Sequence, residues 1–192
     1  MEGLVEIRWH ARGGQGAKTA AILLAEAAEA AGQYIQGFPE YGPERMGAPI
    51  LAFNRLSNKP IRVHGRVESP DIVVVLDPTL IGKVNIGEGF PPHGVLLVNT
   101  PKSPSEVRAK VGVQGGKVYT VDASRIAMEE LGKDIPNTPM MGAVMAIAKL
   151  LDFDKFIEVT RAQMEHKFRG NTKVVEGNIK AIERARQEVK AE

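Results

Sequence analysis

The stretch LVEIRWHARGGQGAKTAAILLAEAAEAAG, residues Leu4–Gly32, decides the fold. Its apolar run Leu4–Trp9 predicts a strand, and the glycine-rich segment His10–Gly16 ends that strand. Thr19–Ala31 is rich in Ala, Leu and Glu, which favour helices, and Gly32 stands where a helix-ending glycine belongs. A strand, a glycine loop and a helix in this order predict a βα unit.

Further strands of the buried parallel type follow along the chain. Asp71–Leu76 (DIVVVL) is a nearly continuous β-branched run, typical of a strand covered on both faces, and Val95–Asn99 and Lys117–Val121 repeat the pattern. The sequence therefore predicts a single α/β domain over residues 1–192, with a Rossmann-like, mostly parallel sheet flanked by helices and a helical C-terminal segment. We expect these helices at Ser124–Leu131, Met140–Leu151, Asp154–Phe168 and Asn171–Lys190.

The region between the first helix and Asp71 is less regular. Tyr34–Gly37 predicts a short strand. Phe38–Pro49 is rich in proline and glycine, which predicts a long ordered loop. Ile50–Leu56 and Ile61–Val63 flank a turn and predict a hairpin.

Composition excludes several classes of function. The 192 residues contain no cysteine, which excludes disulfides, a thiolate nucleophile and any cysteine-held zinc ion or iron–sulfur cluster. A formal net charge of +2 argues against a nucleic-acid binder, and no apolar run is long enough to span a membrane. The amino terminus is acidic and lacks the apolar run of a secretory leader, so we expect a cytoplasmic protein.

The glycine loop predicts an anion site. Backbone N–H groups of glycines and of the following helix N-terminus suit a phosphate. A phosphate-binding Walker loop would need glycine where Arg12 and Ala17 stand, so it is excluded. A dinucleotide fingerprint would align on Gly14 and Gly16, but Thr19 replaces its third glycine, and the second strand ends without the acidic residue that holds a ribose. The alternative to an anion site is a tight turn that needs glycine for close packing alone.

Two other segments carry candidate polar contacts. In Tyr41–Pro49 (YGPERMGAP) the Arg45 guanidinium suits a carboxylate or phosphate, the alternative being a solvated Glu–Arg pair. In Asn137–Gly142 (NTPMMG), Asn137 or Thr138 is expected to cap the next helix, and such an N-terminus can also face a ligand. The nearby Met140, Met141 and Met145 are expected in the core.

The sequence offers no catalytic or metal-binding motif. The four histidines, His10, His64, His93 and His166, are too scattered for a local metal site, and we expect each to lie at the surface or in a satisfied loop position. A GxSxG nucleophile elbow is also absent.

Together the segments resemble a known family. Trp9–Gly16 (WHARGGQG), Phe38-Pro39 with Tyr41–Pro49, and Asn137–Gly142 stand in the order found in the gamma subunit of 2-oxoacid:ferredoxin oxidoreductases, and they resemble the pyruvate enzyme (pyruvate synthase) most. The resemblance covers essentially the whole chain. Members of the family often have Arg at the position of Met46, so this chain has one charge fewer near the loop.

The resemblance implies one part of a larger enzyme. Such complexes convert pyruvate, coenzyme A and oxidised ferredoxin into acetyl-CoA, CO2 and reduced ferredoxin. Thiamine diphosphate, Mg²⁺ and [4Fe-4S] clusters would sit in the alpha, beta and ferredoxin-like delta subunits, because this chain has neither cysteine nor a diphosphate motif. The gamma chain would be inactive alone, would cover the active site and would help to bind coenzyme A.

The same resemblance implies the site residues. The backbone of Arg12, Gly13, Gly14, Gln15 and Gly16 would cradle the coenzyme A phosphates, with Arg45 as a side-chain contact and Thr138 as a polar contact; no catalytic or metal-ligating residue is expected. One alternative is a module that only positions its partners. Two others are a gamma subunit for 2-oxoglutarate or branched-chain substrates and a stand-alone adenine-nucleotide-binding protein.

Overall fold

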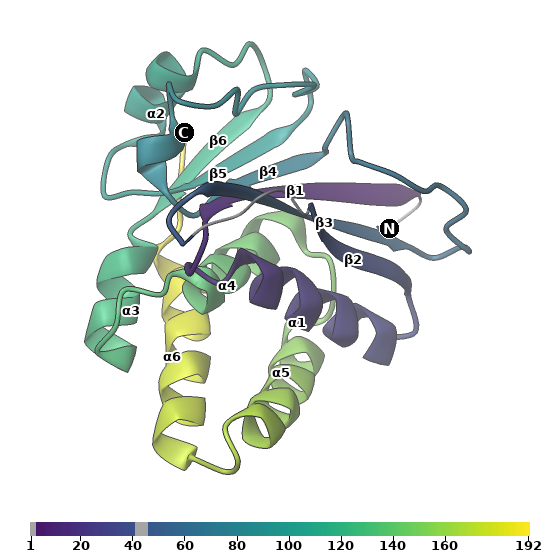
Figure 1. Cartoon of the computed structure of the whole chain (residues 1–192), viewed down its shortest axis with the longest axis vertical. Coiled ribbons are helices and arrows are strands. Elements are labelled where there is room, and N and C mark those ends of the chain that lie inside the picture. The colour runs from purple at the N-terminus through teal and green to yellow at the C-terminus, as the bar shows by residue number, and fades with distance from the viewer. Residues whose placement is uncertain (1–2, 41–45) are drawn as a thin grey trace.

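The computed structural model describes residues 3–40 and 46–192. Its centre is a seven-stranded sheet in the order β2-β3-β1-β4-β5-β6-β7 (Figure 1). The strands β1 (Leu4–Arg12), β4 (Ile72–Val75), β5 (Val95–Asn99) and β6 (Lys117–Val121) pair in parallel. The strands β2 (Tyr34–Glu40), β3 (Pro49–Ser57) and β7 (Lys190–Ala191) pair antiparallel at the two sides. The predicted α/β class with a mostly parallel centre is confirmed.

The helices are divided unequally between the two faces of the sheet. One face carries α1 (Ala17–Ala30), α3 (Ala123–Leu131), α4 (Asn137–Ala148), α5 (Phe153–Lys167) and α6 (Thr172–Glu188) (Figure 1). The opposite face carries α2 (Pro104–Val111) and the 3-10 turn Pro78–Leu80. As predicted, Met140, Met141 and Met145 are in the core, at most 4% exposed.

Alternation along the strands explains the two cores. In β1, Trp9 points into the larger core beneath the sheet, whereas Arg8 and His10 point to the other face. In β4, Val74 belongs to the larger core and Val73 to the smaller one around α2. The strands β4, β5 and β6 therefore sit between two apolar layers, as their β-branched sequences predicted, whereas β1 has polar side chains on its second face.

The predicted hairpin is wrong. β3 pairs with β1 on one side and β2 on the other, and residues 61–63 form no strand. Asn54 of β3 explains the preference, because it accepts a hydrogen bond from Trp9 Nε1 at 2.8 Å and donates one to the Ala21 carbonyl at 2.8 Å. Turn sequence alone cannot show these long-range bonds.

The predicted loop also starts too early, because Phe38–Glu40 belongs to β2. β2 is the last strand at its side of the sheet, and an edge strand tolerates Pro39.

Most predicted helices are present with shifted ends. α4 begins at Asn137, three residues early, and α6 ends at Glu188. Gly32, with φ +78°, follows α1 as expected. We did not predict α2, although its capping box, in which Ser103 and Glu106 bond each other's backbone N–H groups, is readable in the sequence.

Candidate functional site

The glycine loop closes on itself through backbone and amide hydrogen bonds. The Gly13 N–H donates to the Ala48 carbonyl at 2.9 Å, and the Gly13 carbonyl accepts from the Gly47 N–H at 3.1 Å. The Arg12 N–H donates to Gln15 Oε1 at 2.8 Å, while the Gln15 N–H donates to the Arg12 carbonyl at 3.1 Å. The loop is thus fixed to the start of β3 before any ligand arrives.

The Arg12 side chain also holds the loop. Its Nε lies 3.0 Å from Asp77 Oδ2, Nη2 donates to Thr79 Oγ1 at 3.0 Å, and Nη1 donates to the Gly47 carbonyl at 3.0 Å. Burial by itself would raise the pKa of Asp77, but hydrogen bonds from Thr79 and Gln15 and the charge of Arg12 together hold that pKa below its usual value. Asp77 therefore stays ionised and joins the end of β4 to the loop. An acidic residue directly after a buried strand was the signal for it in the sequence.

Gly14 and Gly16 differ from the rest of the loop. Both have positive φ, +100° and +83°, which favours glycine. A Cβ on Gly16 would lie 2.8 Å from Asn137 Nδ2, so a side chain there would displace the Asn137 side chain at the start of α4. The first and third sequence motifs therefore meet at this contact.

A cavity of about 640 Å³ opens beside this contact, between α1, α3, α4, α5 and α6. Thr138 on its wall donates a hydrogen bond to Asn178 Oδ1 at 2.9 Å, and Asn178 Nδ2 donates to the Val174 carbonyl at 2.8 Å. The predicted capping by Asn137 or Thr138 is wrong, because the helix begins at Asn137 with no side-chain cap. The threonine hydroxyl is instead used to join α4 to α6.

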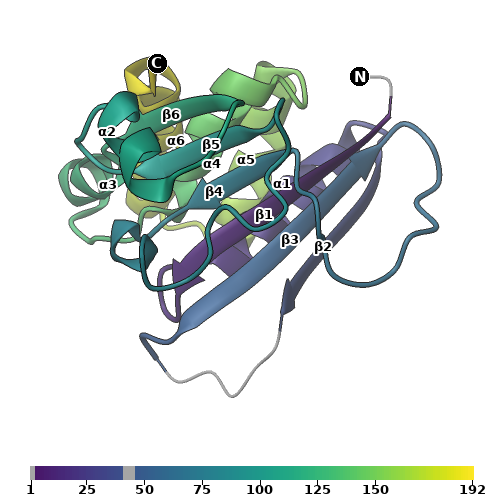
Figure 2. The ribbon, with the colours of Figure 1, turned by 90° about the horizontal axis from the view of Figure 1, so that it is seen from above.

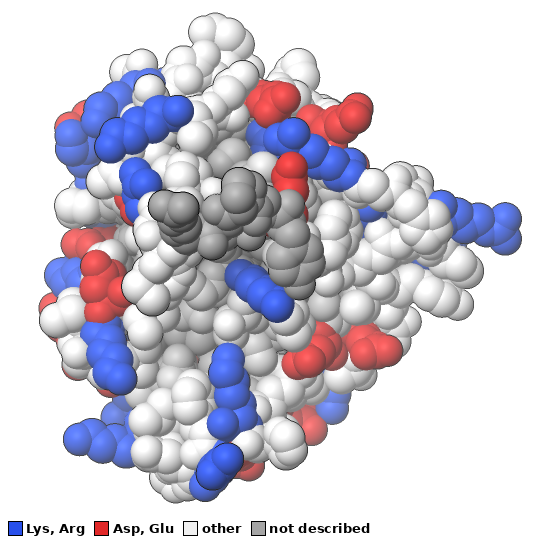
Figure 3. Space-filling view, viewed as in Figure 1, with Lys and Arg blue, Asp and Glu red and all other residues white. Residues whose placement is uncertain are grey.

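Basic side chains dominate the charge that faces the cavity. Lys133, Lys167 and Lys173 line it, and basic side chains are scattered along the helical part of the face in Figure 3. The two lining carboxylates, Glu129 and Glu130, are paired with Arg184 at 2.8 and 2.6 Å. The hydrogen bond from Arg184 is the main cause that keeps the pKa of Glu129 low. These carboxylates therefore stabilise the contact between α3 and α6.

The predicted site residues divide into two groups in the structure. Gly14, Gly16 and Thr138 line the cavity, whereas Arg12, Gly13 and Gln15 shape the loop next to it. Arg45 lies outside the described residues. Sequence reasoning missed the lining residues Lys133, Lys167, Lys173 and Asn178. The only signal for the lysines was a basic residue near a helix end, and Asn178, inside α6, had no signal.

The described residues, 3–40 and 46–192, contain neither a metal-type cluster of side chains nor a membrane-type helix. No group of three or more His, Asp or Glu side chains in these ranges is arranged to hold a metal ion. Within the same ranges no helix combines the length and the apolarity needed to cross a bilayer.

The sheet has parallel strands at its centre, and the glycine loop and the N-terminus of α1 open on a cavity beside the carboxyl end of β1. This arrangement is typical of Rossmann-like α/β proteins. Within that class, residues 6–188 match the pyruvate ferredoxin/flavodoxin oxidoreductase family. The chain belongs to this family and is a gamma-type subunit of an oxidoreductase complex.

Individual relatives agree with this assignment. The chain is 47% identical to the pyruvate synthase subunit PorC of Thermotoga maritima over 96% of this chain and 94% of the relative. It is 46% identical to the common gamma subunit of the pyruvate/ketoisovalerate oxidoreductases of Pyrococcus furiosus, over 82% of this chain and 85% of the relative.

Two solved structures share the fold. The crystal structure of the Thermotoga maritima subunit superposes with a TM-score of 0.86 at 44% identity, over 99% of both chains. A 2-oxoglutarate:ferredoxin oxidoreductase from Magnetococcus marinus, solved with 2-oxoglutarate, coenzyme A and succinyl-CoA bound, matches with a TM-score of 0.78 at 19% identity. That match covers 97% of this chain and 31% of the larger one, and it shows the fold alone.

Proposed function

We propose that this subunit binds coenzyme A in the 640 Å³ cavity and covers the active site of a pyruvate:ferredoxin oxidoreductase complex. The cavity carries the proposal because it brings the glycine loop, the N-terminus of α4 and three lysines to one place. Coenzyme A has a pyrophosphate and a 3′-phosphate, which suit helix N-termini and ammonium groups. The volume lies inside the range of about 300–1,000 Å³ typical of small-molecule sites.

The binding groups have distinct roles in this proposal. The N–H groups at the start of α1, after Gly16, would face one phosphate, and Lys173 and Lys167 another. The amide of Asn137 and the Thr138–Asn178 pair offer polar contacts to the uncharged part of the ligand. The Magnetococcus marinus protein, which has the same fold, was solved with coenzyme A bound, so coenzyme A is the first ligand to test.

The other cofactors belong to partner chains in our proposal. Thiamine diphosphate with Mg²⁺ supplies the electron sink for decarboxylation, and [4Fe-4S] clusters carry electrons to ferredoxin. A chain with no cysteine cannot ligate such clusters, so alpha, beta and ferredoxin-like delta subunits would hold these groups. We place the complex in the cytoplasm and assign it to pyruvate, with the choice of 2-oxoacid made by the other subunits, since the Pyrococcus furiosus gamma subunit is common to two oxidoreductases.

Charge reversal at Lys173 tests whether coenzyme A binds in this cavity. We expect Lys173→Glu to weaken coenzyme A binding to the assembled complex about tenfold, because attraction to a phosphate becomes repulsion. Folding should not suffer, since Lys173 is in the first turn of α6, where an acidic residue favours the helix. Isothermal titration calorimetry gives the dissociation constants.

The matched control is Lys180→Glu, also on α6 but outside the cavity. Its affinity for coenzyme A should stay within about twofold of the wild type, because exposed charges separated from the ligand are screened. Equal affinities for the wild type and both variants would contradict binding in this cavity. Tight binding of ADP without preference for coenzyme A would favour a general adenine-nucleotide site.

A further inference from the structure

One wall of the proposed coenzyme A cavity is formed by α3 and the residues that follow it. It consists of Met128, Lys133 and Ile135, which we call the α3 wall. Gly132, with φ +68°, ends α3, and the turn there brings residues 133–135 to the cavity. Figure 1 and Figure 2 both place α3 at the end of the helical layer away from β2. A different part of the chain from the glycine loop therefore builds this wall.

Lys133 brings a positive charge to the α3 wall. The two carboxylates that line the cavity with it, Glu129 and Glu130, are paired with Arg184 instead, at 2.8 and 2.6 Å. Lys133 is exposed and forms no ion pair with another residue in the ranges 3–40 and 46–192. Its ammonium is therefore available to an anion held in the cavity.

Two apolar side chains of the α3 wall are also uncovered. Met128 is 52% exposed and Ile135 is 37% exposed, although both line a cavity. Leu131, between them in the sequence, packs against α6 instead, with its Cδ2 at 3.0 Å from where a Cβ on Gly177 would stand. Apolar side chains that stay in contact with water at a cavity are typical of ligand sites, because the ligand covers them. The α3 wall thus combines an apolar surface with one cation.

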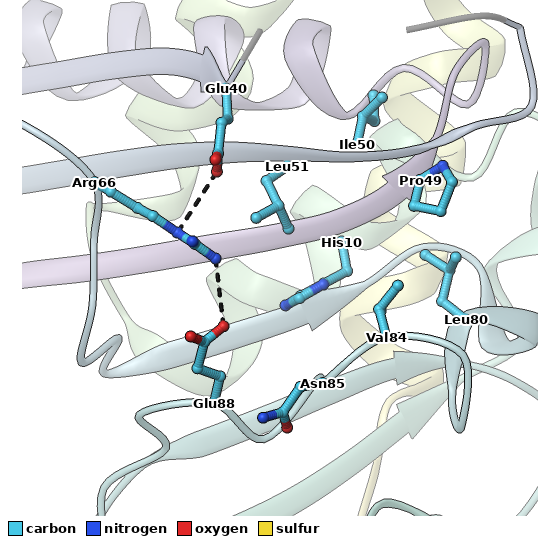
Figure 4. Close-up of a pocket in the computed structure, with 10 residues that line it drawn as sticks. All are labelled: His10, Glu40, Pro49, Ile50, Leu51, Arg66, Leu80, Val84, Asn85 and Glu88. Atoms are coloured by element: carbon cyan, nitrogen blue, oxygen red, sulfur yellow. Dashed lines mark hydrogen bonds and ion pairs between the residues drawn. The ribbon is translucent and has the colours of Figure 1, made fainter. Parts of the chain in front are cut away.

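A smaller cavity lacks this combination. It measures about 280 Å³ and lies above His10 on the face of the sheet opposite α1, which we call the open face. Its rim charges are paired with one another, because Arg66 lies 3.6 Å from Glu40 and 3.3 Å from Glu88 (Figure 4). The α3 wall is the better place for a phosphate, since Lys133 has no such carboxylate beside it.

The parts of coenzyme A differ in the contacts that they need. In the proposed function the start of α1 faces one phosphate of the pyrophosphate, and Lys167 and Lys173 face the other. The pantetheine arm ends in the thiol that reacts, and the reacting cofactors belong to other chains, so the arm has to leave the cavity. The adenine ring and the 3′-phosphate remain, and they need an apolar surface and a cation.

Phe168 is a competing place for the adenine ring, because it also lines the cavity. The Lys167 ammonium already lies 5.8 Å from the centre of the Phe168 ring, in a cation–π contact. Met128 is free of such a contact and offers a polarisable sulfur, which packs favourably against aromatic rings. The α3 wall therefore suits the adenine ring better than Phe168 does.

We infer that the α3 wall binds the adenine ring and the 3′-phosphate of coenzyme A. The ring packs against Met128 and Ile135, and the Lys133 ammonium pairs with the 3′-phosphate. The site thereby selects coenzyme A over adenine nucleotides that lack the 3′-phosphate. This inference rests on the proposed function, because it assumes that coenzyme A occupies the cavity.

Dephospho-coenzyme A, which lacks only the 3′-phosphate, tests the role of Lys133. We expect the assembled wild-type complex to bind coenzyme A about tenfold more tightly than dephospho-coenzyme A, by isothermal titration calorimetry. Lys133→Gln should lower the affinity for coenzyme A about tenfold and leave that for dephospho-coenzyme A within about twofold. The matched control is Lys180→Gln, an exposed lysine outside the cavity, which should leave both affinities within about twofold of the wild type.

Met128→Ala tests the position of the adenine ring. Both ligands carry the ring, so the variant should lower the two affinities by the same factor, about fivefold. Alanine favours helices and Met128 is half exposed, so α3 should keep its fold. Val63→Ala is the control, since Val63 is 51% exposed and lies outside the cavity, and it should change neither affinity.

The outcomes separate this inference from the proposed function. Absence of coenzyme A binding to the wild-type complex would overturn both. Equal wild-type affinity for the two ligands, an equal loss of both in Lys133→Gln, or unchanged affinities in Met128→Ala would overturn the α3 wall as the adenosine site and leave the proposed function standing. Failure of Lys133→Gln to co-elute with the other subunits in size-exclusion chromatography would also overturn it, in favour of a subunit contact.

Discussion

Buried charged side chains fix the loops that lie on the open face of the sheet. Arg8 Nη2 donates to the Ile86 carbonyl at 3.1 Å, and Arg55 Nη1 donates to the Gly65 carbonyl at 2.9 Å. Both arginines are about 1% exposed, so their hydrogen bonds compensate for lost hydration. Burial is the main cause that lowers the pKa of Arg8, and the same low-polarity setting keeps His10 neutral.

His10 gives the chain a specific dependence on pH. The unfolded residue binds a proton near its ordinary pKa of 6.5, whereas the folded residue resists protonation until about pH 3. Above pH 6.5 His10 is neutral in both states and leaves the free energy of unfolding unchanged. As the pH drops from 6.5 towards 3, the free energy of unfolding falls, because only the unfolded chain takes up the proton. At pH 5 the free energy of unfolding is lower by about 2 kcal/mol than above pH 6.5.

His10→Gln should remove this dependence, since glutamine can still accept from Arg8 but does not titrate. Between pH 7 and pH 5, we expect the free energy of unfolding to fall by about 2 kcal/mol less in the variant than in the wild type. Urea denaturation at the two pH values measures the difference. The wild type and the variant share the exposed His64, His93 and His166. An identical pH dependence of the free energy of unfolding in the two proteins would therefore refute the assignment of this dependence to His10.

At the scale of elements, α4 and α6 depend on one close contact. A Cβ on Gly142 of α4 would lie 2.1 Å from the Ile182 carbonyl oxygen of α6, which is backbone and cannot rotate away. The two helices also share the Thr138–Asn178 hydrogen bond on the cavity wall. Their separation therefore sets the shape of the proposed coenzyme A site.

Gly142→Ala should force the two helices apart. We expect a loss of about 3 kcal/mol in the free energy of unfolding, at the upper end of what overpacking costs. For a chain of this size the midpoint of thermal unfolding falls by roughly 10 °C, measurable by calorimetry. Gly87→Ala is the control, since its new methyl group would meet only Val113 Cγ1 at an ordinary 3.4 Å. Equal midpoints for both variants would show that the helices adjust freely.

At the scale of the whole molecule, the two faces of the sheet are covered differently. The helical face holds the cavity with the lysines, and the open face holds the cavity above His10. A ligand bound among the lysines, as we propose, would leave the opposite side of β1 uncovered by that ligand. This division suits a subunit whose own residues include no cysteine for redox chemistry.

Assembly is the prediction at this scale. The chain expressed alone should not support pyruvate-dependent reduction of ferredoxin, and addition of the thiamine-binding and cysteine-rich subunits should restore it. Size-exclusion chromatography of the native protein should show these chains eluting together. Elution of the native chain by itself would favour the stand-alone nucleotide-binding alternative.

The sequence by itself determined the class of fold, the positions of the parallel strands along the chain and the presence of the family motifs. Local patterns suffice to predict these features, because adjacent residues set the structural preference of a β-branched run such as Asp71–Leu76 and of the glycine loop. The resemblance to the family pointed to Gly14, Gly16 and Thr138 as site residues, and the structure brings these three residues to one cavity.

Only the tertiary structure decided which strand pairs with β3, what Thr138 bonds and which lysines face the cavity. The partners of Asn54 and Thr138 lie 33 to 45 residues away along the chain, so no local pattern contains them. The neutral state of His10 likewise depends on burial and on Arg66, 56 positions further along. Pairing across such distances is set by packing of the complete fold, whereas the preference for strand, loop or helix is set by neighbouring residues.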